Sequence, residues 1–499
     1  DLLRILAASP SGATLLRSQD RIEPIAIQSG DVTPGRAIVW TRAAAPGRMT
    51  VRYRTSEKGP ARTIQGPALT AASDFTGRVE LTGLPAGQRI LYEVQVDGAA
   101  PLQGHFLTPP ASASDIRFFW SGDMVGQGWG INPDLGGIRI FDVMRKLQPH
   151  FFIHSGDSIY ADSPVPAEVR LPDGKLWRNR VTEEKSKIAQ TLDEFRGCYR
   201  YNLLDEHVRQ FSAEVAQVWQ WDDHEVTNNW SPSKMLGNDD RYQVKDIRTL
   251  VERARKAYLE YAPLRIERRD PSRIYRRISY GPLLDVFVVD MRSYRGPNTF
   301  NRQEAESADT VFLGRRQMDW LKQGLRASRA TWKVIAADMP VGLIVGDGKD
   351  AQGRSQFEAI ANGDGPALGR ELEIAGLLRF LKTRNIRNTV WLTADVHYTA
   401  AHYYDPAKAR FTEFLPFWEF VSGPLNAGTF GPGVLDDTFG PRVEFSKAPP
   451  KGQSNLSPLS GMQFFGDVQI AGKSRELTVT LRDLTGAALY SETLTPELG

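Results

Sequence analysis

Four short segments of the chain combine acidic residues with serine, tyrosine or histidine, the residue types that bind metal ions and carry protons. Each segment follows an apolar run that predicts a buried strand. The four segments are Ser121-Gly122-Asp123, Gly156-Asp157-Ser158-Ile159-Tyr160, Trp221-Asp222-Asp223-His224-Glu225 and Thr393-Ala394-Asp395-Val396-His397. A single carboxylate after a strand is commonly a turn or cap residue. Four sets at strand ends would repel one another, and a multivalent cation offsets such repulsion, so the spacing predicts a metal site.

The segments that must position these residues alternate between strands and helices. Apolar runs predict strands at 116–120, 151–154, 215–219, 283–290, 332–338 and 389–393. Amphipathic runs predict helices at 137–147, 246–261, 314–326 and 372–384. This alternation predicts a layered α/β core with both sheet faces covered, in which ligands bind at the carboxyl ends of the strands.

A different pattern precedes this core. Short alternating runs in residues 22–110, separated by Gly and Pro, predict a small antiparallel β-sandwich of fibronectin or immunoglobulin type. Residues 84–92 resemble a tyrosine corner, in which Tyr92 would bond back to its own loop. The Pro- and Ala-rich segment 108–114 favours neither helix nor strand, so the catalytic domain is expected over 115–499. Residues 1–21 are expected to be an N-terminal extension.

Composition excludes several classes of protein. The 62 basic and 59 acidic residues leave a net charge of +3 over 499 residues, too little to hold nucleic acid as a stable partner. No run reaches the ~18 apolar residues of a membrane span. A single cysteine, Cys198, rules out an internal disulfide and a zinc site built on several thiolates. The chain begins at Asp1 rather than at a Met, and we expect that either an export signal or another leading segment has been removed. An export signal would place the protein in the periplasm or outside the cell.

The motifs together resemble the PhoD-type alkaline phosphatases and phosphodiesterases of the calcineurin-like metallophosphoesterase superfamily. The resemblance rests on G-D-x-x-Y at 156–160, W-D-D-H-E-V-x-N-N at 221–229 and T-A-D-V-H at 393–397. Residues 28–31 and 38–42 resemble the amino-terminal β-domain of that family, and residues 290–295 and 313–321 its middle segment. It implies a layered αββα core and the hydrolysis of small phosphate esters by a metal-activated hydroxide at a multinuclear site.

The resemblance also implies ligands for two kinds of metal ion. Asp157 would bridge two metals, and Tyr160 would give a phenolate to ferric iron, Fe(3+), a hard ion that suits anionic oxygen. Asp123 and His397 would complete the shell of that iron. The candidates on the second metal are Asp223, Asn228 and Asp395. The alternative for Tyr160 is an ordinary core tyrosine.

Two departures from the family pattern bear on the metals. Asp123 stands where many members carry a cysteine ligand, and no histidine lies between His224 and His397. The second site is therefore rich in oxygen, and oxygen favours calcium, Ca(2+), or manganese over zinc. Calcium is also the ion that the resemblance implies.

Three further residues are candidates for catalysis. His224 follows the expected ligand Asp223 and would protonate the leaving alkoxide, with a purely positioning role as the alternative. Arg292 and Arg295 follow a predicted strand, and their guanidinium groups would either grip phosphoryl oxygens or pair with Asp290 and hold the loop. The aromatic segment 414–418 would either cover the organic group of an ester or pack in the core.

The sequence leaves the type of ester open. Phosphate monoesters, diesters or both are expected, and a phosphotriester is a third option. The rival function is a secreted recognition protein in which the β-domain binds a ligand and the acidic cluster holds structural calcium without catalysis. Tyr160 and His224 argue against that rival, because structural calcium sites use neither phenolate nor imidazole.

Overall fold

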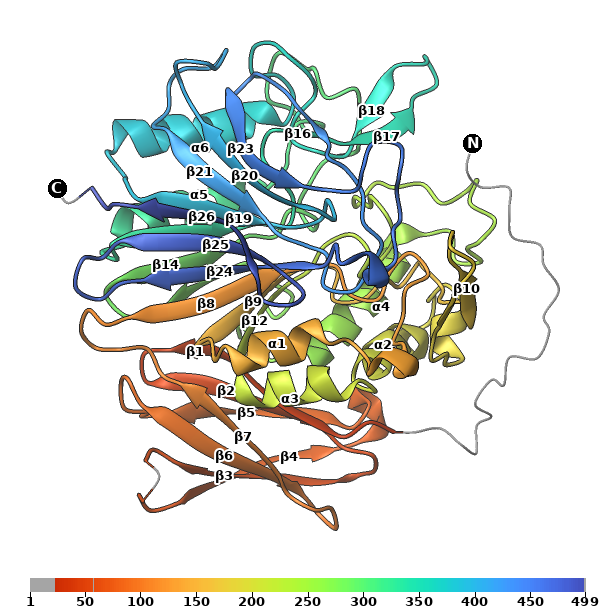
Figure 1. Ribbon diagram of the computed structural model, residues 1–499, viewed down its shortest axis with the longest axis vertical. Helices are drawn as coiled ribbons and strands as arrows, with labels where there is room; N and C mark the ends of the chain where they lie inside the picture. Colours follow the sequence, from red (N-terminus) through yellow and green to blue (C-terminus); the bar gives the residue numbers. More distant parts are fainter. Residues whose placement is uncertain (1–22, 57, 498–499) are drawn as a thin grey trace.

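Two large mixed β-sheets organise the part of the chain that the computed structural model describes, residues 23–56 and 58–497 (Figure 1). The nine-stranded sheet has the order β26 (Ala488–Leu494), β25 (Leu477–Asp483), β24 (Phe464–Ile470), β8 (Ile116–Ser121), β9 (Phe151–Ser155), β12 (Ala216–Gln220), β1 (Ala26–Thr33), β2 (Arg36–Arg42), β5 (Thr76–Thr82). The seven-stranded sheet has the order β13 (Arg276–Ser279), β14 (Leu284–Val288), β15 (Trp332–Ala336), β19 (Thr389–Thr393), β21 (Phe417–Val421), β20 (Thr399–Tyr404), β23 (Pro441–Lys447). The extension expected at residues 1–21 lies outside the described residues.

Parallel strands occupy the middle of each sheet. In the nine-stranded sheet β8 pairs with β9, and β9 with β12, in parallel. In the seven-stranded sheet β14, β15 and β19 pair in the same way. Parallel neighbours bring their carboxyl ends to one edge of the sheet, so the residues that follow these strands gather there.

Six α-helices lie in the described part of the chain. They are α1 (Ile140–Lys146), α2 (Leu192–Asn202), α3 (Glu206–Glu214), α4 (Ile247–Tyr261), α5 (Arg315–Ala327) and α6 (Glu371–Thr383). The sequence predicts α1, α4, α5 and α6 to within three residues at each end. It does not predict α2, since Gly197 interrupts the helical pattern. Glycine fits at this position because a Cβ there would lie 2.3 Å from the Glu184 side chain.

Alternate residues of the parallel strands pack on opposite faces of their sheets. Phe118 and Trp120 of β8 share one core cluster with Val286 and Val288 of β14, so the two sheets pack against each other. The opposite face of β8 and β9 contacts α1 and α3. The opposite face of β14 and β15 contacts α5 and α6 (Figure 1). The Trp120 indole N–H also donates to the Thr393 carbonyl at 3.1 Å and links the sheets directly.

The N-terminal β-unit is a sandwich that shares one sheet with the core. A four-stranded sheet of order β4 (Arg62–Leu69), β3 (Gly47–Arg54), β6 (Arg89–Val96), β7 (Leu102–Leu107) packs on β1, β2 and β5. The sequence predicts a separate sandwich, but β1 pairs in parallel with β12 at Gly30 and Gln217, which makes its sheet continuous with the core. A Cβ on Gly30 would lie 2.4 Å from the Pro263 carbonyl oxygen, so this close approach requires glycine.

Tyr92 does not form the predicted tyrosine corner. Its hydroxyl donates to the Ala213 carbonyl of α3 at 3.0 Å, because β6 lies in the sheet that faces the core. The prediction of a bond to its own loop is wrong, and the residue instead fastens the N-terminal unit to α3.

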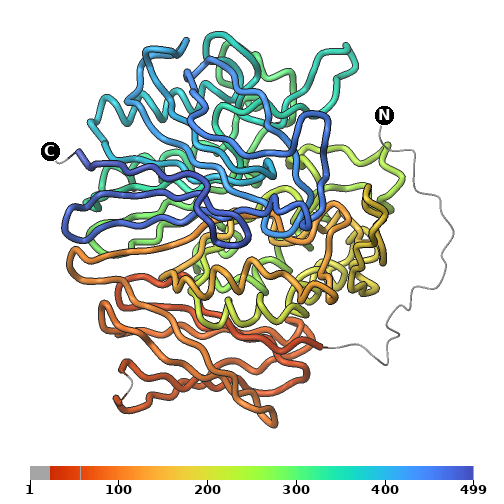
Figure 2. Tube along the Cα trace, in the orientation of Figure 1, coloured from red at the N-terminus to blue at the C-terminus, as the bar shows by residue number. Residues whose placement is uncertain are grey.

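The last strands of the chain return to its first core strand. β24 pairs antiparallel with β8, and Figure 2 shows this late segment (blue) running beside the early one (orange). Three two-stranded ribbons lie in the loops: β10 (Glu168–Arg170) with β11 (Leu176–Arg178), β16 (Leu343–Ile344) with β22 (Val434–Leu435), and β17 (Gly346–Lys349) with β18 (Ser355–Phe357). Within the described ranges, none of the helices has the length and apolar character needed to cross a membrane.

Candidate metal centre

Acidic residues from both sheets meet at the carboxyl ends of the parallel strands. Asp123 follows β8, Asp157 follows β9, and Asp222 with Asp223 follow β12. The seven-stranded sheet contributes residues after β14, β15 and β19. These are Arg292, Asp338, Asp395 and His397. The predicted convergence of strand ends is therefore what the structure shows.

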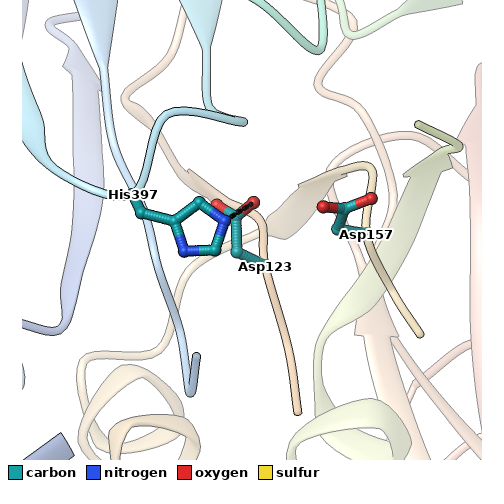
Figure 3. A group of neighbouring side chains, drawn as sticks. All are labelled: Asp123, Asp157 and His397. Atoms are coloured by element: carbon teal, nitrogen blue, oxygen red, sulfur yellow. Dashed lines mark ion pairs between the residues drawn. The ribbon is translucent and has the colours of Figure 1, made fainter. Parts of the chain in front are cut away.

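A first group of possible metal ligands contains Asp123, Asp157 and His397. Each offers one ligand atom, and these atoms lie within 4.8 Å of one another. Figure 3 shows the three side chains gathered from three different segments. His397 Nε2 lies 3.5 Å from Asp123 Oδ1. Tyr160 joins them, because its hydroxyl lies 2.8 Å from His397 Nε2 and 3.4 Å from Asp123 Oδ1.

The surroundings of His397 present Nε2 as an acceptor. Its Nδ1 lies 2.5 Å from the Gly428 carbonyl oxygen, a contact that requires the proton on Nδ1. Burial lowers the pKa of His397 to about 4, so the ring stays neutral. A neutral imidazole with one nitrogen fixed by a carbonyl is a typical metal ligand.

A second group contains Asp157, Asp223 and His224, again within 4.8 Å. Asp157 belongs to both groups. The backbone N–H of His224 donates to Asp157 Oδ1 at 3.1 Å, and the ring Nδ1 lies 2.6 Å from Asp162 Oδ1. Since Nδ1 pairs with Asp162, Nε2 is the ring atom that can meet a ligand in the cavity.

The charge of His224 follows from its acidic neighbours. Burial lowers its pKa, but the carboxylates of Asp162 and then Asp223 outweigh the burial and raise the pKa of His224 to about 9. Asp162 is held in turn by the backbone N–H of Asn228 at 2.7 Å. This arrangement keeps a proton on a ring that lines the cavity.

Arg292 fills a third acidic group, formed by Asp222, Asp223 and Asp395. Its Nη2 lies 2.5 Å from Asp222 Oδ1, 3.6 Å from Asp395 Oδ1 and 4.0 Å from Asp223 Oδ1. Its Nη1 lies 2.6 Å from Glu358 Oε1. The side chain is fully buried, so a fixed guanidinium supplies the positive charge that these carboxylates need.

Arg292 and Arg295 lie buried beside the centre. They are not among the described residues that line the cavity, and their assignment to phosphoryl oxygens stays a prediction. Their guanidinium groups do not pair with Asp290, the alternative that the sequence offers. Arg295 Nη1 lies 3.3 Å from Glu358 Oε2, and its Nη2 donates to Asn298. Both guanidinium groups are held in this position because buried carboxylates, those of Asp222 and Glu358, pair with them.

The remaining acids carry unfavourable charge. Burial and neighbouring carboxylates raise the pKa of the Asp123, Asp157 and Asp395 carboxyl groups well above their usual range. Burial and the charge of Asp157 also raise the pKa of the Tyr160 phenol. These shifts show how strongly the site disfavours its own negative charge.

The donor set fits bound cations. Asp123 Oδ2 and Asp223 Oδ1 are buried and have no hydrogen-bond partner among the described residues. Burying a carboxylate oxygen without a partner costs free energy. Multivalent ions held by carboxylate, phenolate and imidazole groups would satisfy these oxygens.

Four of the candidate metal ligands adopt a positive φ, a backbone conformation that is uncommon for residues other than glycine. Asp123, Asp157, Asp395 and His397 have φ values of 67°, 49°, 68° and 59°. A non-glycine residue in this left-handed region is held there at a cost and often marks a functional site. The turns after β8, β9 and β19 therefore aim these side chains at one point.

Asn228 lies at the edge of the site. It is exposed, and it lines the same cavity as Asp157 and Asp223. The structure uses its backbone N–H to hold Asp162. Its assignment as a ligand stays a prediction.

Several site residues lie beyond the sequence-based assignments. Asp162 comes two residues after Tyr160, and Asp338 comes two residues after β15, so both carry a signal of position that could have found them. Glu225 accepts from the backbone N–H groups of Asp157 and Ser158 and fixes the turn after β9. Glu358 lies in a loop, and nothing in the local sequence distinguishes it from a surface acid.

A cavity of about 600 Å³ opens from the centre. His224 and Asp162 line it together with five of the expected ligands and with apolar residues from the segments 343–345, 396 and 430. The five ligands are Asp157, Asp223, Asn228, Asp395 and His397. Phe414 and Phe417 pack in the core against α6 and do not cover the site, so the core alternative for segment 414–418 is correct.

Comparison with known sequences gives two family matches. Residues 118–481 match the PhoD-like phosphatase family, and residues 12–110 match the N-terminal domain of PhoD-like phosphatases. The chain is 25% identical over 435 residues to alkaline phosphatase D of Bacillus subtilis (strain 168). That alignment covers 83% of this chain and 71% of the relative.

Two solved structures have a similar fold. The structure of PhoD matches with a TM-score of 0.69 and 19% identity, over 97% of this chain and 90% of that chain. The purple acid phosphatase PPD1 from yellow lupin (Lupinus luteus) seeds matches with a TM-score of 0.55 and 11% identity, over 95% of this chain and 74% of that chain. At such low identities these likenesses describe the fold alone.

Proposed function

The chain belongs to the PhoD-like phosphatase family, and on this premise we propose that it is a metal-dependent phosphoric ester hydrolase. The observation that carries the proposal is the position of the Asp157 carboxylate, which lies within 4.8 Å of ligand atoms of Asp123 and His397 on one side and of Asp223 on the other. One carboxylate between two groups suits a multinuclear site. The substrates would be small phosphate esters, either monoesters or diesters, with triesters as a less favoured third class.

The residues divide between two proposed metal positions. Asp123, Tyr160 and His397 would hold the first metal, Asp223 and Asp395 with Asn228 the second, and Asp157 both. When bound, the metals would supply a nucleophile derived from water and neutralise charge on the phosphoryl oxygens. The buried Arg292 guanidinium lies beside Asp395 and Asp223 and would offset part of their negative charge.

His224 would act as the general acid. Its Nδ1 is held by Asp162, so Nε2 would donate a proton to the oxygen of the departing alcohol. The raised pKa keeps that proton available at neutral and mildly alkaline pH. The stacking of His224 on Tyr160, with ring centroids 4.2 Å apart, supports a fixed ring orientation.

For the identity of the metals we propose ferric iron at the first position and calcium, with manganese or zinc as alternatives, at the second. The position of the Tyr160 hydroxyl beside Asp123 and His397 supports iron, because a hard trivalent ion suits an anionic phenolate oxygen. The oxygen-rich second group supports calcium. We also propose export from the cytoplasm, supported by the family resemblance, and an αββα core, supported by the packing of α1 and α3 on one sheet and of α5 and α6 on the other.

The test combines metal analysis with hydrolysis. The purified protein should contain two metals per chain or more, hydrolyse p-nitrophenyl phosphate, lose activity on chelation and regain it on remetallation. An absorption band in the visible that Tyr160→Phe abolishes would identify a phenolate on iron. Calcium bound without hydrolysis of any phosphate ester would instead support the rival, a recognition protein with a structural ion.

A further inference from the structure

The cavity above the metal centre has a lining of two chemical kinds. Acidic and histidine side chains of the centre form one part. An apolar wall forms the other, and it consists of Leu343, Ile344, Val345, Val396 and Phe430. With a volume of about 600 Å³, the cavity falls in the range of sites that enclose a whole small ligand, and a phosphoryl group alone would leave much of it empty.

Phe430 places the apolar wall next to a proposed metal ligand. Its ring lies 5.2 Å from the His397 ring, centroid to centroid, at 76°. Its backbone N–H donates to the His397 carbonyl at 3.3 Å. An organic group attached to a phosphoryl group at the centre would therefore lie within reach of the Phe430 ring.

The rest of the wall is built from a two-stranded ribbon. In it Leu343 of β16 pairs with Leu435 of β22, and Ile344 with Val434. A Cβ on Gly433 would lie 2.7 Å from Leu343 Cδ1, so the chain after Phe430 packs directly on the Leu343 side chain of the wall.

Buried polar contacts fix the start of this ribbon. The Val341 N–H donates to Glu419 Oε1 at 2.7 Å, and the Gly342 N–H donates to the Tyr404 hydroxyl at 2.9 Å. Tyr404 in turn donates to Glu419 Oε2 at 2.8 Å. The apolar wall is ordered before any ligand binds, which lowers the entropic cost of binding.

The charges around the cavity do not favour a second anionic group. Apart from His224, Arg241 is the one basic side chain among the described residues that line it. The Arg241 guanidinium is already paired, with Nη2 2.7 Å from Asp239 Oδ2 and Nε 2.9 Å from Asp239 Oδ1. The nearby Asn229 side chain donates to Asp347, a further acid at this edge. A substrate with an anionic group far from the metals would meet paired or negative groups.

We propose, on the basis of the proposed hydrolase function, that the preferred substrates are phosphate esters of apolar alcohols. The phosphoryl group would lie at the metal centre while the alkyl or aryl group packs on Phe430 and Ile344. Apolar burial gives roughly a four-fold gain for each CH₂ group. Esters whose alcohol ends in a charged group would gain nothing from the wall.

The test uses ethyl, butyl and hexyl phosphate, whose leaving alcohols have nearly the same acidity, and 5-carboxypentyl phosphate as the charged counterpart. We expect kcat/KM to rise at least 10-fold from ethyl to hexyl phosphate and to fall back for the carboxylate. Equal values for all four esters would overturn the proposal. A protein that at full metal content hydrolyses neither these esters nor p-nitrophenyl phosphate would instead refute the hydrolase function itself.

Variants locate the effect on the wall. Ile344→Ser should flatten the rise from ethyl to hexyl phosphate, and Phe430→Ser should flatten it further, whereas Phe430→Leu should keep most of it. Val434→Ser is the matched control, because Val434 pairs with Ile344 but is 69% exposed and lies outside the cavity lining. Metal content is measured for each variant, since Phe430 lies beside His397. A full chain-length effect in Ile344→Ser and Phe430→Ser, or its loss in Val434→Ser, would contradict the proposed location.

Discussion

The pairing of His224 with Asp162 determines what this histidine can do. Asp162 takes Nδ1, raises the pKa of the ring and leaves Nε2 toward the cavity. Asp162 also accepts from the Asn228 backbone N–H, so the carboxylate is fixed on both oxygens. These contacts favour proton donation over a passive positioning role.

Replacing His224 tests that role through the leaving group. An alkoxide of pKa about 16 needs a proton in the transition state, and a nitrophenolate of pKa about 7 hardly does. We expect His224→Gln to lose about 100-fold or more in kcat/KM on ethyl phosphate and far less on p-nitrophenyl phosphate.

Metal content separates the two explanations of a loss. His207→Gln, in α3 and away from the site, is the control and should retain both activities. Equal losses of His224→Gln on both esters at full metal content would show that His224 only positions the centre.

Sequence alone identifies the acids that follow strands but not the charges that surround them. Asp123, Asp157, Asp223, Asp395 and His397 follow apolar runs, which makes them visible. Glu358 lies in a loop distant in the sequence, and its carboxylate forms ion pairs with the guanidinium groups of Arg292 and Arg295. Such a pairing depends on tertiary contacts, which the local sequence around these arginines does not record.

At the scale of elements, the turns after the strands do the positioning. Asp123, Asp157 and Asp395 each adopt a positive φ directly after β8, β9 or β19. The Gly-Asp sequences at 122–123 and 156–157 predict two of these turns. The six predicted core strands and four of the helices follow from periodicity. The sequence does not predict β13, β20, β21, β23, α2, α3 or the small ribbons, which depend on packing that periodicity does not record.

A pair of buried carboxyl groups joins the start of α6 to the loop before β23. Glu371 Oε2 accepts from the Asn362 side chain at 3.0 Å, and Asp436 Oδ2 accepts from the Asn362 backbone N–H at 3.2 Å. Burial and the adjacent Asp436 raise the pKa of Glu371 to about 9. Glu371 therefore keeps its proton in the folded protein far above the pH at which it ionises in the unfolded chain.

This pair predicts a pH dependence of stability. Between pH 4.5 and about 9 the folded state binds more protons at Glu371 than the unfolded state does, so the free energy of unfolding contributed by this group falls as pH rises. Glu371→Gln mimics the protonated form and should reduce the decline between pH 5 and 9, as measured by denaturant unfolding. The same slope in the variant and the parent would contradict the assignment.

At the scale of the whole molecule, the N-terminal unit and the core behave as one body because charged side chains cross between them. Asp74 lies 2.8 Å from Arg200 Nη1 of α2 and 3.3 Å from Arg42 Nη2 of β2, and it accepts from the Tyr261 hydroxyl of α4. The prediction of a self-contained sandwich misses this, since hydrophobic alternation shows that strands exist but not which sheet they join.

Loss of Asp74 should therefore destabilise the molecule. Asp74→Asn removes the carboxylate that Arg42 and Arg200 share. Arg42 keeps Glu23, and Arg200 keeps Glu184 and Asp193, so we expect a loss of about 1.5–3 kcal/mol in the free energy of unfolding. Asp173→Asn is the control, because Asp173 pairs with Lys175 at the surface and such pairs contribute about 0–1 kcal/mol. Similar losses for both variants in chemical denaturation would show that the buried network does not join the two units.

The most direct test of the account is metal binding by Asp157→Asn. Asp157 belongs to both ligand groups, so its replacement should lower the content of both metals, measured by elemental analysis, and abolish hydrolysis of p-nitrophenyl phosphate. Asp134→Asn, at an exposed position outside the site, should change neither. If Asp157→Asn loses one metal while the other binds with the affinity of the parent protein, or if it retains hydrolysis, then Asp157 does not join two metals and the proposed centre is wrong.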